Sequence, residues 1–180
     1  MRITETGFDG LLVIHPDVFV DSRGHFFESY HSDKFKKAGI DYTFVQDNHS
    51  MSYKGVLRGL HFQNPPYAQG KLVKVLSGSV LDIVVDIRKK SATFGKNYAI
   101  TLNAKEHTIL WIPPGFAHGF VALEDNTIFH YKCTNLYNKD SEGGIIYNDP
   151  DLELNWGIKA PIVSDKDKIL PLIKNVSILF

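Results

Sequence analysis

Short apolar runs separated by turn residues make up most of the chain, and the breaks recur about every ten residues, a spacing typical of a β-sandwich or β-barrel. The clearest pair of strands covers residues 72–76 and 80–87, joined by Ser77-Gly78-Ser79, and predicts a hairpin. Valine and isoleucine are abundant, which supports strands because β-branched side chains fit a pleated surface. Further strands are predicted at residues 18–20, 25–30, 97–102, 108–112, 119–123 and 127–132.

One short helix is predicted at residues 33–38, with Ser32 as its N-cap and Gly39 beyond its end. From about residue 149 the chain is rich in turn residues, and we expect this segment to wrap around the strands. No internal repeat, charge block or linker divides the sequence. We therefore predict one all-β domain over residues 1–180, with a few short helices at its periphery.

Composition and charge narrow the classes of partner. Twenty Lys and Arg residues balance twenty Asp and Glu residues, so charge gives no reason to expect nucleic acid or an anionic membrane as a partner. No window approaches the roughly 18 apolar residues that a membrane helix requires. Because the N-terminus lacks an apolar export signal and Cys133 is the one cysteine, we expect a cytoplasmic protein.

Polar and ionisable residues interrupt the apolar strands at three places. The first combines residues 46–48 with residues 58–63, the second is Lys71, and the third is residues 111–120 followed by Tyr131. Each also has an ordinary structural explanation. A strand histidine is usually a hydrogen-bonded structural residue, a lysine reaches solvent with its amine, and a tyrosine fills a core.

A metal site is one alternative that these residues raise. His61 and His118 could meet across a barrel and bind a transition metal if further ligands joined them. However, the residue two positions beyond His61, on the same face of the predicted strand, is Gln63 and not histidine. The next charged residue is the cationic Lys71, which would oppose metal binding. We therefore expect no metal.

Several motifs occur together along most of the chain: Arg58-Gly59-Leu60-His61-Phe62-Gln63, Gln69-Gly70-Lys71-Leu72-Val73, Gly78-Ser79-Val80, Val85-Asp86-Ile87-Arg88, Ser91-Ala92-Thr93-Phe94-Gly95, Ile112-Pro113-Pro114-Gly115-Phe116-Ala117-His118-Gly119-Phe120, Asn148-Asp149-Pro150-Asp151 and Ser164-Asp165-Lys166-Asp167. With these motifs the chain resembles the dTDP-4-dehydrorhamnose 3,5-epimerase family from residue 10 to about residue 170. The resemblance implies a cupin-type jelly roll and a homodimer that exchanges strands at its interface.

The resemblance also implies a reaction, inversion at C3 and C5 of dTDP-4-dehydro-6-deoxy-D-glucose to give dTDP-4-dehydro-L-rhamnose. Both carbons lie next to the C4 ketone, so removal of either proton gives an enolate. By resemblance His61 is the base, Tyr131 is the acid on the opposite face, and Asp167 holds His61. Lys71 would stabilise the oxygen of the enolate. The reaction needs no redox cofactor, because the substrate already carries its ketone.

The remaining matched positions imply nucleotide-sugar binding. Tyr137 would stack on the thymine ring, and arginine suits the diphosphate because its planar fork makes bidentate contacts. The other residues that the resemblance assigns to substrate binding are Arg23, Glu28, Gln46, Asn48, Arg58, His118, Glu142 and Lys166.

Three alternatives remain open at this stage: an epimerase that acts at C3 alone, a ketoisomerase on a related nucleotide sugar, and a cupin that binds a sugar nucleotide without catalysis. The chain also departs from the family at two places. Tyr67 stands where the family commonly has histidine, and the apolar tail at residues 174–180 lies outside the resemblance.

Overall fold

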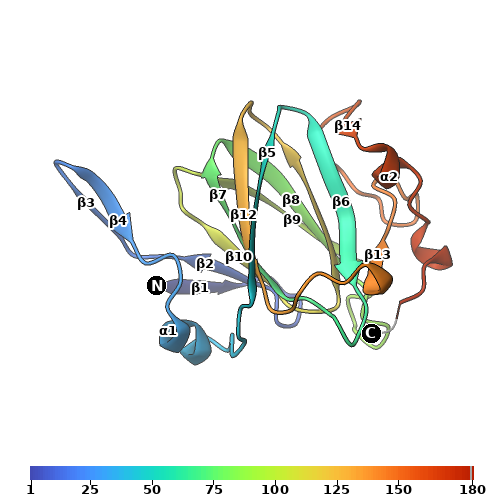
Figure 1. Ribbon diagram of the computed structural model, residues 1–180, viewed down its shortest axis with the longest axis horizontal. Helices are drawn as coiled ribbons and strands as arrows, with labels where there is room; N and C mark the ends of the chain where they lie inside the picture. Colours follow the sequence, from blue (N-terminus) through green and yellow to red (C-terminus); the bar gives the residue numbers. More distant parts are fainter. Residues whose placement is uncertain (179) are drawn as a thin grey trace.

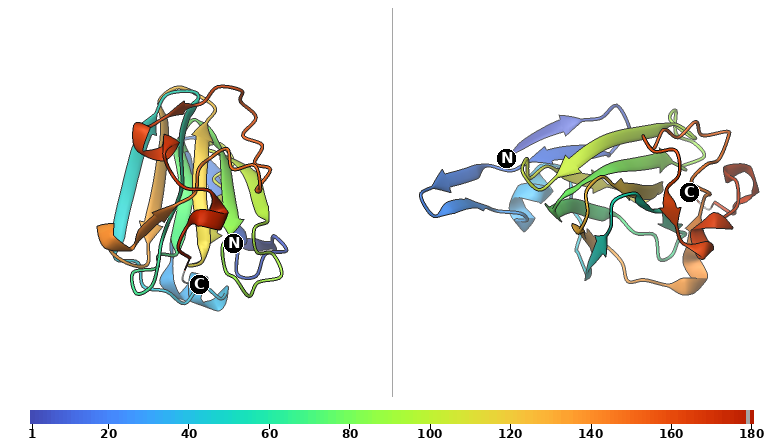
Figure 2. Two further views of the ribbon diagram at one scale, coloured as in Figure 1. Left: turned by 90° about the vertical axis from the view of Figure 1, so that its right-hand side faces the viewer. Right: turned by 90° about the horizontal axis from the view of Figure 1, so that it is seen from above.

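Two β-sheets packed face to face form the body of the protein in the computed structural model, which describes residues 1–178 and 180 (Figures 1 and 2). The first sheet contains, in spatial order, β1 (Arg2–Glu5), β2 (Leu12–His15), β10 (Ile109–Ile112), β7 (Lys71–Ser77), β12 (Thr127–Cys133) and β5 (Gln46–Ser52). The second contains β13 (Glu142–Gly144), β6 (Val56–Gln63), β11 (Phe116–Ala122), β8 (Ser79–Asp86) and β9 (Asn97–Asn103), with β14 (Ile162–Val163) parallel to β6. This architecture confirms the predicted all-β fold.

The other elements are short and lie around the two sheets. A separate hairpin, β3 (Val18–Asp21) with β4 (Gly24–Phe27), projects from the body in Figure 1 and is called the arm below. The helices are α1 (Ser32–Lys37), η1 (Lys139–Ser141), α2 (Asp165–Lys168) and η2 (Ile173–Asn175). No helix among the residues that the structure describes is long and apolar enough to cross a membrane.

The predicted hairpin at residues 72–76 and 80–87 is wrong in its pairing, although both strands exist. Strand β7 pairs with β10 and β12, whereas β8 pairs with β11 and β9 in the other sheet. The chain changes sheets at Gly78, where φ is +77°. A Cβ atom at this glycine would lie only 3.1 Å from Cα of Thr127. Ser77-Gly78-Ser79 is therefore a corner between the sheets and not a hairpin turn.

The predicted helix is present, but Ser32 is not its cap. Helix α1 begins at Ser32, and the N-cap is His31, which has an extended backbone and makes no side-chain capping bond. The carbonyl of His31 accepts the backbone N–H of Phe35 at 3.0 Å. Phe35 is buried, so packing of this side chain holds the helix against the core without a serine cap.

The second sheet is buried on both faces, which explains why β8 is apolar almost throughout. Val80 and Val84 of β8 point into the core between the two sheets. Ile83 and Val85 point to the opposite face, where the C-terminal segment covers them with side chains that include Trp156. The C-terminal segment therefore forms a third layer over the second sheet (Figure 2).

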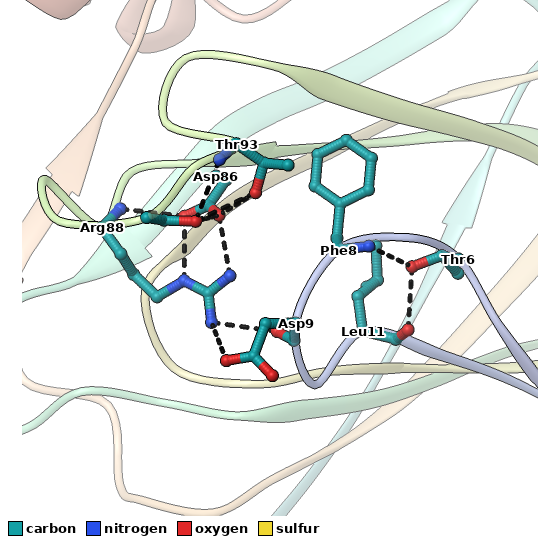
Figure 3. Close-up of polar contacts among 8 residues, drawn as sticks. Thr6, Phe8, Asp9, Leu11, Asp86, Arg88 and Thr93 are labelled. Atoms are coloured by element: carbon teal, nitrogen blue, oxygen red, sulfur yellow. Dashed lines mark hydrogen bonds and ion pairs between the residues drawn. The ribbon is translucent and has the colours of Figure 1, made fainter.

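A polar cluster fastens the end of β8 to the loops around it (Figure 3). The carboxylate of Asp86 is fully buried and accepts hydrogen bonds from the side chains of Arg88, Ser91 and Thr93. Arg88 also donates to the backbone carbonyl of Asp9 at 2.9 Å, which connects this loop to the one between β1 and β2. These hydrogen bonds lower the pKa of Asp86 from 3.8 to about 2, against the opposing effect of its burial.

Candidate active site

A cavity of about 530 Å³ is lined by both sheets and by the segment that carries α2. A second recess of about 370 Å³ is lined partly by the same residues, since His61, Lys71 and Tyr131 line both. The other lining residues of the cavity are Ser50, Val56, Leu57, Arg58, His118, Gly119, Phe120, Phe129, Ile162, Val163, Ser164, Lys166 and Asp167. Those of the second recess are Gln46, Asn48, Phe62, Gln63, Gln69, Tyr137 and Glu142.

A bulge in β6 brings Arg58 and His61 to the same cavity. Simple alternation would place residues three positions apart on opposite faces of a strand. In the pairing of β6 with β11, however, His61 faces His118 and Arg58 faces Phe120, so β6 contains one residue more than its partner over this stretch. The extra residue restores both side chains to the cavity side.

The imidazole of His61 is held by a buried carboxylate. Its Nε2 lies 2.8 Å from Oδ1 of Asp167, whose Oδ2 accepts the backbone N–H of Gly59 at 3.2 Å. Burial by itself would raise the pKa of Asp167, but the hydrogen bonds from His61 and Gly59 and the charge of Lys166 lower it. A charged Asp167 fixes the Nε2–H tautomer of His61, so Nδ1 is the nitrogen that can accept a proton from a molecule in the cavity.

Tyr131 and Lys71 reach the cavity from the opposite sheet. In the pairing of β12 with its neighbours, Tyr131 faces Val73 on one side and Asn48 on the other, while Lys71 faces Cys133. Burial raises the pKa of the Tyr131 hydroxyl, which keeps the phenol protonated and able to act as an acid. Burial also lowers the pKa of the Lys71 ammonium, although nearby acidic groups oppose this effect.

Two stacked rings separate the sheets beside these residues. Phe120 of β11 and Phe129 of β12 stack with their centroids 4.2 Å apart and their planes 21° apart. Phe129 also lies 6.0 Å from the ring of His118, and both phenylalanines are at least 95% buried. We call this pair the aromatic spacer, because one ring comes from each sheet.

A chain of polar contacts links the second recess to α2. The hydroxyl of Tyr137 donates to Oε2 of Glu142 at 3.1 Å, and the amine of Lys166 donates to Oε1 of the same carboxylate at 2.7 Å. The backbone N–H of Tyr137 donates to Gln46 at 2.9 Å, and the Gln46 amide donates to Asn48 at 3.1 Å. These five predicted substrate-binding residues therefore form one continuous hydrogen-bonded surface.

Arg23 and Glu28 do not line the cavity or the second recess. Arg23 lies at the turn of the arm, where its exposed side chain pairs with Asp21 at 2.5 Å. Glu28 follows the arm and forms an ion pair with Lys34 of α1. Within one chain the structure therefore brings together every predicted site residue except these two.

Asp82 is a buried acidic residue at the site that the sequence analysis did not select. It is fully buried, and its Oδ2 lies 2.9 Å from Nε2 of His118. Its position in the apolar run 80–87 was a visible signal, because an aspartate in such a run must find a partner when the strand is buried. Among the described residues there is no group of three or more His, Cys, Asp or Glu side chains that could hold a metal ion.

The sequence is similar to known proteins over nearly its whole length. A sequence profile described as dTDP-4-dehydrorhamnose 3,5-epimerase matches residues 5–175. The chain belongs to this family. The protein of that name from Shigella flexneri is 49% identical over 168 residues, 93% of each chain, and the one from Methanothermobacter thermautotrophicus is 44% identical over 170 residues, 93% of this chain and 91% of that one.

Solved structures of relatives share the same fold. The crystal structure of dTDP-6-deoxy-D-glucose-3,5-epimerase from Legionella pneumophila, in complex with dTDP-4-keto-L-rhamnose, has a TM-score of 0.93 at 44% identity, over 97% of this chain and 93% of that one. A 3'-monoepimerase from Streptomyces bikiniensis, in complex with dTDP-quinovose, has a TM-score of 0.89 at 30% identity, over 94% of this chain and 86% of that one. The fold is thus the cupin-type sandwich that the resemblance to this family implies.

Proposed function

We propose that this epimerase inverts C3 and C5 of dTDP-4-dehydro-6-deoxy-D-glucose to give dTDP-4-dehydro-L-rhamnose. One observation carries the proposal: His61 and Tyr131 project into the same cavity from different sheets. Inversion at a carbon requires that a proton leave one face and that another arrive on the opposite face. A base and an acid on opposing sheets can meet a sugar ring from its two sides.

The proton transfers follow from the state of each side chain. His61 accepts the proton from C3 or C5 at Nδ1 while Asp167 holds Nε2, and the electron pair of the C–H bond moves into an enolate. Tyr131 then donates its hydroxyl proton to the same carbon on the opposite face. Each inversion leaves His61 protonated and Tyr131 ionised, so a proton returns from His61 to Tyr131 through solvent before the second carbon reacts.

Lys71 stabilises the negative charge that develops on the C4 oxygen. Lys71 lines both the cavity and the adjoining recess, so one cation can serve the enolate formed from either carbon. This role explains why β7 places a lysine at the cavity between the two sheets. We propose that the reaction uses no metal and no cofactor, because histidine, tyrosine and lysine supply the base, the acid and the cation.

The dTDP group would occupy the surface formed by the second recess. Tyr137 is 56% exposed, so its ring is available to stack on thymine. Glu142 and Lys166 flank the connection between this recess and the cavity. Arg58, whose guanidinium is bound to the Ser52 hydroxyl at 3.1 Å, supplies a cation for the diphosphate.

We further propose a homodimer in which the arm of one chain completes the site of the other. The arm exposes a group of apolar side chains, Val18, Phe19, Val20 and Phe26, and Phe19 and Phe26 are 64% and 66% exposed. Such a patch usually marks an interface. An arm laid on the partner subunit would carry Arg23 to a cavity that it does not reach in its own chain. We expect this dimer in the cytoplasm.

An epimerase that acts at C3 alone is the second candidate, because a 3'-monoepimerase shares the fold. Proton NMR of the substrate in deuterated water separates the two. Deuterium at both C3 and C5, with a rhamnose-configured product trapped by a reductase, supports the proposal. Exchange at C3 alone assigns a monoepimerase, and exchange at neither carbon overturns both. The variant His61→Asn is the matched control, since it should exchange neither proton.

A further inference from the structure

Two histidines at the site are each bonded to a buried carboxylate through the same ring nitrogen. His61 and His118 face each other directly across β6 and β11. Nε2 of His61 is bound to Asp167, and Nε2 of His118 is bound to Asp82 at 2.9 Å. In both rings Nδ1 is therefore the nitrogen left for a bound molecule. The proposed reaction gives a task to the first carboxylate but none to Asp82.

Folding alone does not account for Asp82. It lies between Val80 and Val84, which point into the apolar core between the sheets, and it is fully buried. Its Oδ1 is buried and has no hydrogen-bond partner among the described residues. A buried carboxylate that has one hydrogen bond and one unsatisfied oxygen contributes little to stability, because the unsatisfied oxygen carries the full cost of leaving water. By contrast Asp86, equally buried on the same strand, has hydrogen bonds to both of its oxygens.

Lys71 supplies the second observation. The structure gives its ammonium no direct carboxylate partner among the described residues. Burial lowers the pKa of Lys71, and the neighbouring Cys133, Asp82 and Glu142 oppose that effect. The Cys133 thiol stays neutral at pH 7, because burial raises its pKa. Of the other two, Asp82 is a buried carboxylate, whereas Glu142 is engaged by Lys166. The other ionisable groups that line the cavity with Lys71 are Arg58, His61, His118, Tyr131, Lys166 and Asp167.

We propose that Asp82 is a positioning residue for the epimerisation: it orients His118 with Nδ1 toward the cavity that Lys71 also lines. The same carboxylate opposes the effect of burial on the pKa of Lys71. Asp82 does not touch the substrate itself and acts through these two residues. The inference rests on the proposed function, because Lys71 is given its role by the enolate. The inference adds Asp82 as an electrostatic partner of Lys71, and Asp82 lies in the core and does not line the cavity.

The test compares Asp82→Asn with Asp86→Asn, a matched control on the same strand. Asparagine at position 82 removes the charge and preserves the size of the side chain. We expect kcat to fall by about tenfold to a hundredfold with KM changed less than about threefold, because a misplaced group affects chemistry more than binding. The alkaline limb of the kcat–pH profile should move to lower pH by about one unit, as expected for loss of a neighbouring opposite charge. The Asp86→Asn control should keep kcat and the alkaline limb of the wild type.

Nitrogen-15 NMR of the free protein tests the same inference without substrate. The titration of the Lys71 amine, assigned by its absence from Lys71→Arg, should move to lower pH in Asp82→Asn and stay unchanged in Asp86→Asn. The wild-type spectrum should show Nε2 of His118 protonated at pH 7, a measurement that stands even if Asp82→Asn does not fold. An unprotonated Nε2, or an Asp82→Asn variant with wild-type kcat and Lys71 titration, would overturn the inference. Absence of deuterium exchange in the wild type would instead overturn the proposed function, while the NMR titrations would still report on Asp82.

Discussion

The cluster around Asp86 gives a quantitative prediction for stability. The carboxylate accepts five hydrogen bonds from Arg88, Ser91 and Thr93, and they lower its pKa from 3.8 to about 2. That difference corresponds to about 2–3 kcal/mol of stability at neutral pH. Asp86→Asn removes the charge and turns an N–H group toward the donors, so the free energy of unfolding should fall by at least about this amount.

The sign of the pH dependence follows from the lowered pKa. The unfolded chain protonates Asp86 near pH 3.8 and the folded chain near pH 2, so the stabilisation is complete above pH 3.8 and is lost as pH falls toward 2. The difference between wild type and Asp86→Asn should therefore narrow in acid. Urea unfolding at pH 7 and at pH 3, followed by circular dichroism at one protein concentration, measures it.

The control for this experiment is Asp9→Asn. The Asp9 carboxylate is 98% exposed and lies 3.7 Å from Arg88, so its loss should cost less than about 0.5 kcal/mol. If Asp86→Asn lost no more stability than Asp9→Asn, or if its deficit stayed constant between pH 7 and pH 3, the reasoning about Asp86 would be refuted.

Three further predictions concern the acid, the arm and the corner between the sheets. Tyr131→Phe should remove the proposed proton donor and lower kcat by about a hundredfold or more while leaving dTDP binding unchanged, as measured by progress curves and calorimetry. Phe19→Asp combined with Phe26→Asp should give a monomer by light scattering that has lost activity. A dimer with these two changes would show that the arm does not form the interface. Gly78→Ala should destabilise the protein by about 1–3 kcal/mol in thermal unfolding, because φ is +77° and the added Cβ meets Thr127. A neutral result would indicate that this corner relaxes easily.

Local pattern predicted the strands β7 to β12 but not β1, β2 and β5, and it did not show how the strands pair. The run at residues 80–87 reads as a strand because both of its faces are buried, and that reading is correct. The short Gly-containing turn that precedes it in the sequence is equally compatible with a hairpin and with a change of sheet. The choice at Gly78 is made by contact with Thr127, which lies about fifty residues away.

The site shows the same limit. The motifs identified His61, Lys71 and Tyr131, and these residues do line one cavity. Strand alternation could not place Arg58 beside His61, because the bulge in β6 depends on its pairing with β11. Nor could the sequence of one chain show that Arg23 lies on an arm outside the cavity.

The aromatic spacer, Phe120 and Phe129, affects the chemistry of the site through the distance between the two sheets. Because His61 and Tyr131, the proposed proton acceptor and proton donor, belong to different sheets, the distance between them depends on what fills the core, and Phe120 and Phe129 fill it beside the cavity. The spacing between the two sheets at the cavity must therefore match the thickness of one sugar ring. Substituting either phenylalanine would change the spacing of the sheets, and with it the distance between His61 and Tyr131, while His61 and Tyr131 themselves are unchanged. Selection for turnover can therefore act on the volume of core side chains.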